Sequence, residues 1–489
     1  MPATAAPQPE QFTSLAPKSA ARRAEAPVEP PDPAALEAAT IAMGRKIFAL
    51  ADRQKTDLFS AETLRSKMLE LMMKDENLRY RMLRFTDVYV ALKSSRAVAQ
   101  HLVEYLESPA LEVGLKPTPL LALARRGGRI GAYFPAVTDW ATRQGTMQMA
   151  RHFIAGDKPA EVAQTIRRTE AQGFMFSLDL LGEFVASERQ ADDFAGRYEE
   201  MVARFGRVLG AMPRNRPQAV RACGPRVNVS IKLSSLTSKF EPADPEGTSA
   251  AVRERLRPLF RAAVKSGAFI NVDMEKFEYR ALTLRILRDL LSEPEFRGFP
   301  NVGTVAQAYL RDADTVLSDF LDWAVGAKQP ITIRLVKGAY WDSEQIWARS
   351  RRWPIPVLLH KHETDAMYER CLGVLLPRHS QGIRTAIASH NVRSIAHGLA
   401  LAKALRVPEG RYECQVLFGM AGPFKEALRR MGVPVRIYTP CGDLLEGMAY
   451  LVRRILENTS NESFLRLRFT EGAAVEALLK NPARAHLPG

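Results

Sequence analysis

The sequence predicts an α/β fold in which a (βα)8 barrel of the TIM type follows an N-terminal helical region. Eight short apolar runs rich in β-branched and aromatic residues occur in the last two thirds of this 489-residue chain. Amphipathic stretches such as SAAVRERLRPLFRAAVKSG and ALTLRILRDLLSE separate these runs. Regular alternation of strands and helices indicates a parallel sheet, and eight units in about 300 residues fit a closed barrel. A doubly wound open sheet is the alternative, although it usually has fewer units.

Four parts follow one another along the chain. Residues 1–34 are rich in Pro and Ala and end in VEPPDP, so we expect them to be disordered. Residues 35–170 are expected to form a helical arm and connector, because stretches such as ALEAATIAMGRKIFALADRQ carry apolar residues three and four positions apart. The barrel is expected to span residues 171–480, and a short tail covers residues 481–489.

Eight runs are expected to form the barrel strands. They are FMFSLDL (174–180), VNVSIKL (227–233), FINVD (269–273), VGTVAQ (302–307), ITIRLV (331–336), TAIAS (385–389), CQVLF (414–418) and VPVRIY (433–438). Their lengths of five to seven residues are ordinary for strands.

The composition narrows the class of protein. Hydrophobic residues make up 46% and charged residues 25% of the chain, as in ordinary soluble domains, and no apolar run approaches the ~18 residues of a membrane span. The start of the sequence lacks the charged-then-apolar pattern, so we expect no signal peptide. The four cysteines are scattered without a CxxC pair, which favours a reducing compartment over a disulfide framework. The net charge of +15 is spread along the chain, so we expect no nucleic-acid partner. An arginine-rich surface and attraction to anionic lipid both remain open.

Ionisable and polar residues stand at the carboxyl ends of the predicted strands. The set comprises Asp179, Lys232, Asp273, Gln307, Arg334, Lys337, His390, Asn391 and Tyr438, with Glu183 in the loop after the first strand. Active sites of (βα)8 barrels lie at this edge, so we expect a ligand site there. Taken singly, Asp273 could cap a helix and His390 could be a hydrogen-bonded core histidine. His360 and His362 lack a third ligand nearby in sequence, so we expect no metal site.

The last predicted helix, DLLEGMAYLVRRILENTSNESF, carries a polar stripe. Tyr450, Arg453, Arg454 and Glu457 fall at i, i+3, i+4 and i+7, near one helix face. The stripe is either a solvated basic face with an Arg453–Glu457 pair or a paired-arginine clamp for a carboxylate, since the planar guanidinium suits bidentate binding. Periodicity does not choose between the two. The chain has no Walker loop, no GxGxxG opening a βαβ unit and no GxSxG.

Several long motifs resemble one known family. In chain order they are IKLSSL, NVDMEKFE, RLVKGAYWDSE, IASHN, RIYTP and AYLVRRILEN. Together they resemble the proline dehydrogenase domain of the proline utilization A (PutA) family, and the resemblance runs from about residue 40 to 480. It implies a distorted (βα)8 barrel that binds FAD and oxidises L-proline to Δ1-pyrroline-5-carboxylate, the first step of proline catabolism to glutamate. It also implies a membrane quinone as electron acceptor, for a cytoplasmic protein that docks peripherally on the inner face of the cytoplasmic membrane.

The resemblance assigns roles to individual residues. It implies catalytic roles for Lys232, Asp273, Arg334, Tyr438, Arg453 and Arg454. It implies substrate contacts from Lys232, Asp273, Leu335, Ala339, Tyr340, Leu417, Tyr438, Tyr450, Arg453 and Arg454. It implies cofactor contacts from Asp273, Gln307, Arg334, Val336, Lys337, Gly338, Trp341, Thr364, His390, Asn391, Leu417, Arg454 and Glu457.

Within these sets, the resemblance places Arg334 beside the flavin ring, where a cation stabilises the charge gained on reduction. Arg453 and Arg454 would hold the proline carboxylate with help from Lys232, and Asp273 would pair with Lys232. Glu183 would form a gate with Arg453.

Two departures from the family pattern bear on the reading. FGMA at 418–421 follows the seventh strand where the family often has HGMG, which affects a contact near Leu417. The sequence stops at Gly489, whereas a full PutA continues into an aldehyde dehydrogenase domain that oxidises the product. We therefore expect a stand-alone enzyme, one half of a split pair or a truncated chain, and the sequence leaves its oligomeric state open. A flavin barrel enzyme for a related cyclic amino acid such as hydroxyproline is the alternative function.

Overall fold

The structure, a computed structural model, describes most of the chain. The described residues are 31–53, 92–108, 119–142, 153–182, 185–210, 222–420, 422–443 and 474–484, with the single positions 78, 81, 84, 85, 88, 89, 220 and 447. The N-terminal stretch expected to be disordered lies outside this part, except for its last four residues.

Eight parallel strands close into a barrel in chain order, which confirms the predicted fold class. The strands are β1 (Met175–Leu180), β2 (Asn228–Ile231), β3 (Phe269–Val272), β4 (Val302–Gln307), β5 (Ile331–Val336), β6 (Ile383–Ala388), β7 (Tyr412–Leu417) and β8 (Val435–Cys441). The barrel is closed by β1 and β8, which pair from Met175–Arg436 to Leu180–Cys441.

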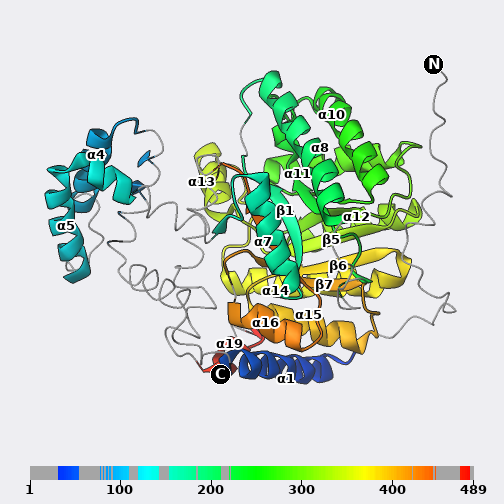
Figure 1. The fold of residues 1–489 in the computed structure, drawn as a ribbon. Coiled ribbons are helices and arrows are strands. Elements are labelled where there is room, and N and C mark those ends of the chain that lie inside the picture. The colour runs from blue at the N-terminus through cyan, green and yellow to red at the C-terminus, as the bar shows by residue number, and fades with distance from the viewer. Residues whose placement is uncertain are drawn as a thin grey trace, which may run out of the picture.

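The helices cover the outside of this barrel (Figure 1). They are α7 (Pro159–Ala171), α8 (Glu188–Gly210), α10 (Pro245–Ser266), α11 (Phe277–Ser292), α12 (Ala313–Gly326), α13 (Trp341–Arg351), α14 (Lys361–Leu375), α15 (Val392–Ala404) and α16 (Gly422–Arg430). Short 3₁₀ turns are η3 (Leu233–Leu236), η4 (Leu376–Gln381) and η5 (Pro482–Arg484). One continuous hydrophobic cluster fills the space between the outward strand faces and the helices.

Two strands begin earlier than the apolar pattern predicts. β6 starts at Ile383 and β7 at Tyr412, two residues before the expected starts. The added residues include Arg384 and Glu413, whose charge interrupts the apolar runs. Both line a cavity inside the barrel, so their charge reflects a polar interior rather than a loop.

The N-terminal helical region has two parts. Helices α4 (Ser95–Glu107) and α5 (Pro119–Ala132) pack on each other around Leu106 and Leu121 and lie apart from the barrel (Figure 1). Helix α1 (Pro33–Asp52) instead packs along α15 and α16 on the barrel surface. Within the described part of the chain, none of the helices combines the length and apolar character that a membrane span requires.

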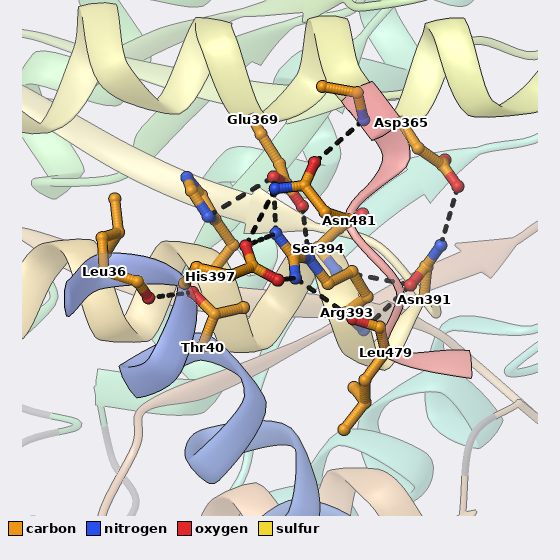
Figure 2. A network of polar contacts seen from close by, with 12 residues as sticks. Leu36, Thr40, Asp365, Glu369, Asn391, Arg393, Ser394, His397, Leu479 and Asn481 are labelled. Atoms are coloured by element: carbon orange, nitrogen blue, oxygen red, sulfur yellow. Dashed lines mark hydrogen bonds and ion pairs between the residues drawn. The ribbon is translucent and has the colours of Figure 1, made fainter. Parts of the chain in front are cut away.

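A polar clasp joins both ends of the chain to the barrel (Figure 2). The clasp is centred on Arg393 of α15, which is 2% exposed. Its Nε and Nη2 donate to Glu369 of α14 at 2.7 and 3.0 Å, and its Nη1 and Nη2 donate to Glu37 of α1 at 2.6 and 2.8 Å. Nη1 also donates to the Leu479 carbonyl at 3.1 Å, next to the short helix α19 (Val475–Leu478). All five N–H donors of the guanidinium are therefore used.

Replacing Arg393 by methionine should lower the free energy of unfolding by about 3–5 kcal/mol, because two carboxylates would lose their buried cation. The matched control is Arg45→Met, since Arg45 also links α1 to the C-terminal segment, through Glu476 at 3.4 Å, with both side chains more than half exposed. That change should cost less than about 1 kcal/mol. Urea unfolding of both variants measures the difference, and equal losses would contradict the account.

The clasp should also make stability depend on pH near neutrality. Burial lowers the pKa of His397, which lies 3.4 Å from Glu369. Between that lowered value and the unfolded value near 6.5, the unfolded chain binds the proton more readily, so stability falls as pH drops below about 6.5. The loss is at most about 1.4 kcal/mol per pH unit. Urea titrations from pH 7.5 to 5.5 should show this slope, and His397→Gln should flatten it; an unchanged slope would contradict the assignment.

Candidate active site

Charged side chains gather inside the barrel at the carboxyl ends of its strands. Side chains alternate between the two faces of a strand, and Asp179, Asp273, Arg334 and Tyr438 fall on the inward face of their strands or just beyond them. The fully buried neighbours of Arg334 along the strand, Ile333 and Leu335, belong to the outer hydrophobic cluster. The alternation of side chains along each strand therefore explains why these polar groups share the inward face.

Arg334 is the hub of this cluster. Its guanidinium, 4% exposed, donates through Nη1 to Asp273 Oδ1 at 2.7 Å. Nη2 donates to the hydroxyls of Ser177 at 3.2 Å and Ser230 at 3.0 Å. The guanidinium carbon also lies 5.0 Å from the centre of the Tyr438 ring.

Asp273 joins this hub to Tyr438. The Tyr438 hydroxyl donates to Asp273 Oδ2 at 2.8 Å, and Asn271 Nδ2 donates to Oδ1 at 2.9 Å. Burial raises the pKa of Tyr438, and the nearby carboxylates Asp179 and Asp273 raise it further. The phenol therefore stays protonated at neutral pH and acts as a donor to Asp273.

A second ion pair stands beside the first. Lys232 Nζ donates to Asp179 Oδ1 at 2.5 Å, and both side chains are less than a tenth exposed. This differs from the expected Lys232–Asp273 pair, because Arg334 is the cation opposite Asp273. Burial raises the pKa of Asp179, and the Asp273 charge acts in the same direction, while Lys232 opposes the shift. Two carboxylates and two cationic side chains thus share one buried site.

A third group of predicted residues lies at the ends of β5 and β6. Lys337 forms an ion pair with Asp365 of α14, and Asn391 Nδ2 donates to the other oxygen of that carboxylate at 3.1 Å. Burial lowers the pKa of Lys337. Asn391 also caps α15 by accepting from the backbone N–H groups of its first turn. Because Arg393 follows Asn391 directly, the group adjoins the clasp, as Figure 2 shows.

The remaining strand-end residues take different positions. His390 Nε2 accepts the Leu417 backbone N–H at 3.1 Å, which ties β6 to β7. Thr364 is buried in the first turn of α14. Tyr340 and Trp341 lie at the start of α13, where Trp341 is 39% exposed and donates from its indole to the Leu358 carbonyl at 2.8 Å.

Further along β5, Val336 and Lys337 are half-buried and Ala339 is exposed. Leu335 faces away from the cluster: its side chain is fully buried on the opposite face of β5 from Arg334. The side chain occupies the hydrophobic layer between strand and helix, and the substrate contact expected of Leu335 stays a prediction.

Gly338 has a structural requirement of its own. Its φ is +138°, and a Cβ there would lie 2.4 Å from the ring of Tyr309. Among the described residues, it is the Tyr309 ring that packs closely against this glycine.

Two buried polar atoms of the site have no hydrogen-bond partner among the described residues. They are Gln307 Oε1, an acceptor, and Arg334 Nε, a donor. Gln307 is held by its amide, which donates to the carbonyls of Met274 at 3.3 Å and Glu275 at 3.0 Å. Buried polar groups are rarely left unsatisfied. A flavin ring carries both N–H and carbonyl groups at its edges, so the pair fits such a ligand.

Several predicted site residues lie outside the described part of the chain. They are Glu183, Tyr450, Arg453, Arg454 and Glu457. Four residues of the site in the structure are absent from the predicted set: Ser177, Ser230, Asn271 and Asp365. Three of these stand two positions before a predicted site residue or strand-end acid, so the period of two along a strand could have identified them.

Comparisons with known proteins point to one family. The family model described as "Proline dehydrogenase" matches residues 162–467, which contain the whole cluster described above. The model described as "Proline utilization A N-terminal domain" matches residues 37–153.

Individual relatives agree with these matches. The bifunctional protein PutA of Escherichia coli K12 is 31% identical over 344 residues, which cover 69% of this chain and 25% of that protein. Proline dehydrogenase 1 of Bacillus subtilis 168 is 26% identical over 329 residues, 67% of this chain and 93% of that protein. The matched region thus spans about a quarter of the curated PutA relative and nearly all of the shorter one.

Solved structures resemble this fold as well. PutA from Bdellovibrio bacteriovorus inactivated by N-propargylglycine has a TM-score of 0.81 at 35% identity, and the match covers 93% of this chain and 45% of that one. PutA from Corynebacterium freiburgense has a TM-score of 0.57 at 30% identity, covering 69% of this chain and 32% of the other.

Proposed function

This chain belongs to the proline dehydrogenase family, and we propose that it catalyses the FAD-dependent oxidation of L-proline to Δ1-pyrroline-5-carboxylate. The observation that supports this most is the buried Arg334–Asp273–Tyr438 cluster at the carboxyl edge of the barrel. The cluster lies within the segment that matches the family. It supplies a fixed cation and donor where a (βα)8 enzyme performs its chemistry.

The cofactor would be held by residues from β4 to β6. Gln307 Oε1 and Arg334 Nε offer an unsatisfied acceptor and donor for the ring, while Lys337, Thr364, His390 and Asn391 would contact the rest of FAD. When bound, the flavin would accept the hydride that leaves C5 of proline as the C5–N bond becomes double. Arg334 stabilises the negative charge that accompanies this uptake.

The substrate carries a carboxylate and a secondary amine, and the site offers a partner for the carboxylate. Lys232 would help Arg453 and Arg454 to hold it, each charge-assisted hydrogen bond contributing roughly 1.5–3 kcal/mol. Cations around the carboxylate also disfavour the protonated amine, which matters because the nitrogen lone pair must assist loss of hydrogen from C5. The Tyr438 ring would pack against the pyrrolidine and exclude water.

Electrons would then leave for a membrane quinone, which implies peripheral docking at the inner face of the cytoplasmic membrane. The product would be oxidised to glutamate by an aldehyde dehydrogenase partner. The printed name of the E. coli relative, "Bifunctional protein PutA", supports a second activity in that protein.

Proline-dependent reduction of a dye by the purified protein tests the proposal. We expect turnover with L-proline that exceeds turnover with hydroxyproline. A flavin-loaded protein that reduces the dye with neither would overturn it.

Changing Gln307 to leucine should weaken FAD binding by up to about tenfold, because one net hydrogen bond contributes about 0.5–1.5 kcal/mol. Gln415→Leu is the matched control. Gln415 also has a buried Oε1 that lacks a partner among the described residues, but it lines the cavity that contains Arg384 and Glu413. Fluorescence titration of the apoprotein with FAD measures both affinities. Equal effects of the two changes would contradict the role given to Gln307.

A further inference from the structure

The barrel contains a polar cavity at the end opposite the candidate active site. Its water-accessible volume is about 20 Å³, enough for one water-sized particle or two. Residues at the starts of β6, β7 and β8 line it, together with the loops around Cys223 and Gly410. Arg334 lines this cavity and also donates to Asp273 in the candidate active site.

Four guanidinium groups and one carboxylate line this cavity: Arg334, Arg384, Arg411, Arg436 and Glu413. Glu413 is fully engaged by Arg436, whose Nε and Nη2 donate to its two oxygens at 2.6 and 2.8 Å. Gln415 donates to the same carboxylate at 2.7 Å. Arg436 is itself satisfied, since its remaining contacts are the Phe176 carbonyl at 2.9 Å and the Met175 sulfur at 3.5 Å. The only carboxylate among the lining residues is therefore already neutralised.

Arg384 and Arg411 have no counter-charge in direct contact. Neither side chain has a hydrogen bond or ion pair to any residue that the structure describes, and both residues are only partly exposed. Burial lowers the pKa of Arg384, and the charge of Arg411 lowers it further. Buried charges in proteins are normally paired, because their desolvation is otherwise uncompensated. Two neighbouring cations in one cavity thus require an anion.

The loops that form the walls of the cavity pack closely on one another and on Arg384. A Cβ on Gly224, where φ is +102°, would lie 3.2 Å from Arg384 Nη1, so the loop backbone rests directly on the guanidinium. A Cβ on Gly410 would lie 2.4 Å from the Ala222 carbonyl, so the two loops touch each other. These contacts hold Arg384 beside the cavity, where it can bind a ligand without first being ordered.

We propose that a small monovalent inorganic anion, chloride in ordinary buffers, binds between Arg384 and Arg411 and stabilises the folded barrel. The volume favours an ion of about the size of water over phosphate or a larger carboxylate. The site lies at the far end of the barrel from the proposed chemistry, and its walls share Arg334 and Asn271 with the cluster around Asp273.

Bromide is the probe that locates the ion. Crystals soaked in sodium bromide should show an anomalous difference peak within hydrogen-bonding distance of both guanidiniums. The full-length protein should also unfold at a higher temperature as sodium chloride replaces sodium gluconate at constant ionic strength, with a saturable rise. Arg384→Gln should abolish both the peak and the rise.

The control and a second variant keep the test decisive. Arg370→Gln, which removes an exposed cation paired with Asp314, should keep the full chloride response. Arg411→Gln repeats the experiment if the first variant does not fold. No bromide peak, or a chloride response that survives in the folded variant, would overturn the proposal. A peak without any chloride-dependent shift would mark an adventitious ion only and would overturn it as well.

Discussion

Replacing Arg334 by methionine should abolish proline oxidation and lower the free energy of unfolding by about 3–5 kcal/mol. The reason is that Asp273, 9% exposed, would lose its cation and remain as a buried carboxylate held only by Asn271 and Tyr438. The hydroxyls of Ser177 and Ser230 would lose their guanidinium contacts too. Urea unfolding measures the stability, and single-turnover flavin reduction measures the chemistry.

A double variant separates the two effects. Arg334→Met combined with Asp273→Asn removes both charges, so most of the lost stability should return, because an uncharged pair carries no unpaired ion. Activity should stay lost, since the cation that is proposed to lie beside the flavin is still absent. Recovery of flavin reduction in the double variant would contradict the role given to Arg334.

Replacing Gly338 by alanine should remove bound flavin from the purified protein. A φ of +138° is strained for any residue with a side chain and costs about 1–3 kcal/mol. The new methyl group would also collide with the buried Tyr309 ring, so the ends of β4 and β5 would have to separate. That movement displaces Gln307 and Lys337, which are proposed to hold the cofactor.

Gly373→Ala in α14 is the matched control, because nothing lies within 4 Å of a Cβ at that position. It should be neutral or stabilise the protein by about 0.5–1 kcal/mol, as expected for alanine in place of glycine in a helix. Absorbance of the two purified variants compares their flavin content. A Gly338→Ala protein that keeps its full flavin content would contradict this account.

The barrel could be predicted from sequence because each strand is a local pattern. β4 and β5 have the predicted bounds, since apolar runs bury their outward faces and polar residues follow at once. The starts of β6 and β7 could not be found in this way, because Arg384 and Glu413 point into a polar interior that no local pattern signals.

The partners within the site were harder to predict than its members. Asp273, Arg334 and Tyr438 could be predicted as a site because each lies in or directly after a predicted strand, in its carboxyl-terminal half. Which cation faces which carboxylate depends on the relative height of strands distant in sequence, and the structure pairs Lys232 with Asp179 instead of Asp273. The clasp at Arg393 could not be predicted either, because it joins Glu37 to a residue 356 positions later in the sequence.

The central claim is that this barrel oxidises L-proline with a bound flavin, and an anaerobic visible spectrum tests it most directly. The purified protein should show flavin absorption bands, and these should bleach when L-proline is added without any other reductant. Bands that persist after L-proline is added, in protein that is reduced normally by dithionite, would contradict the claim.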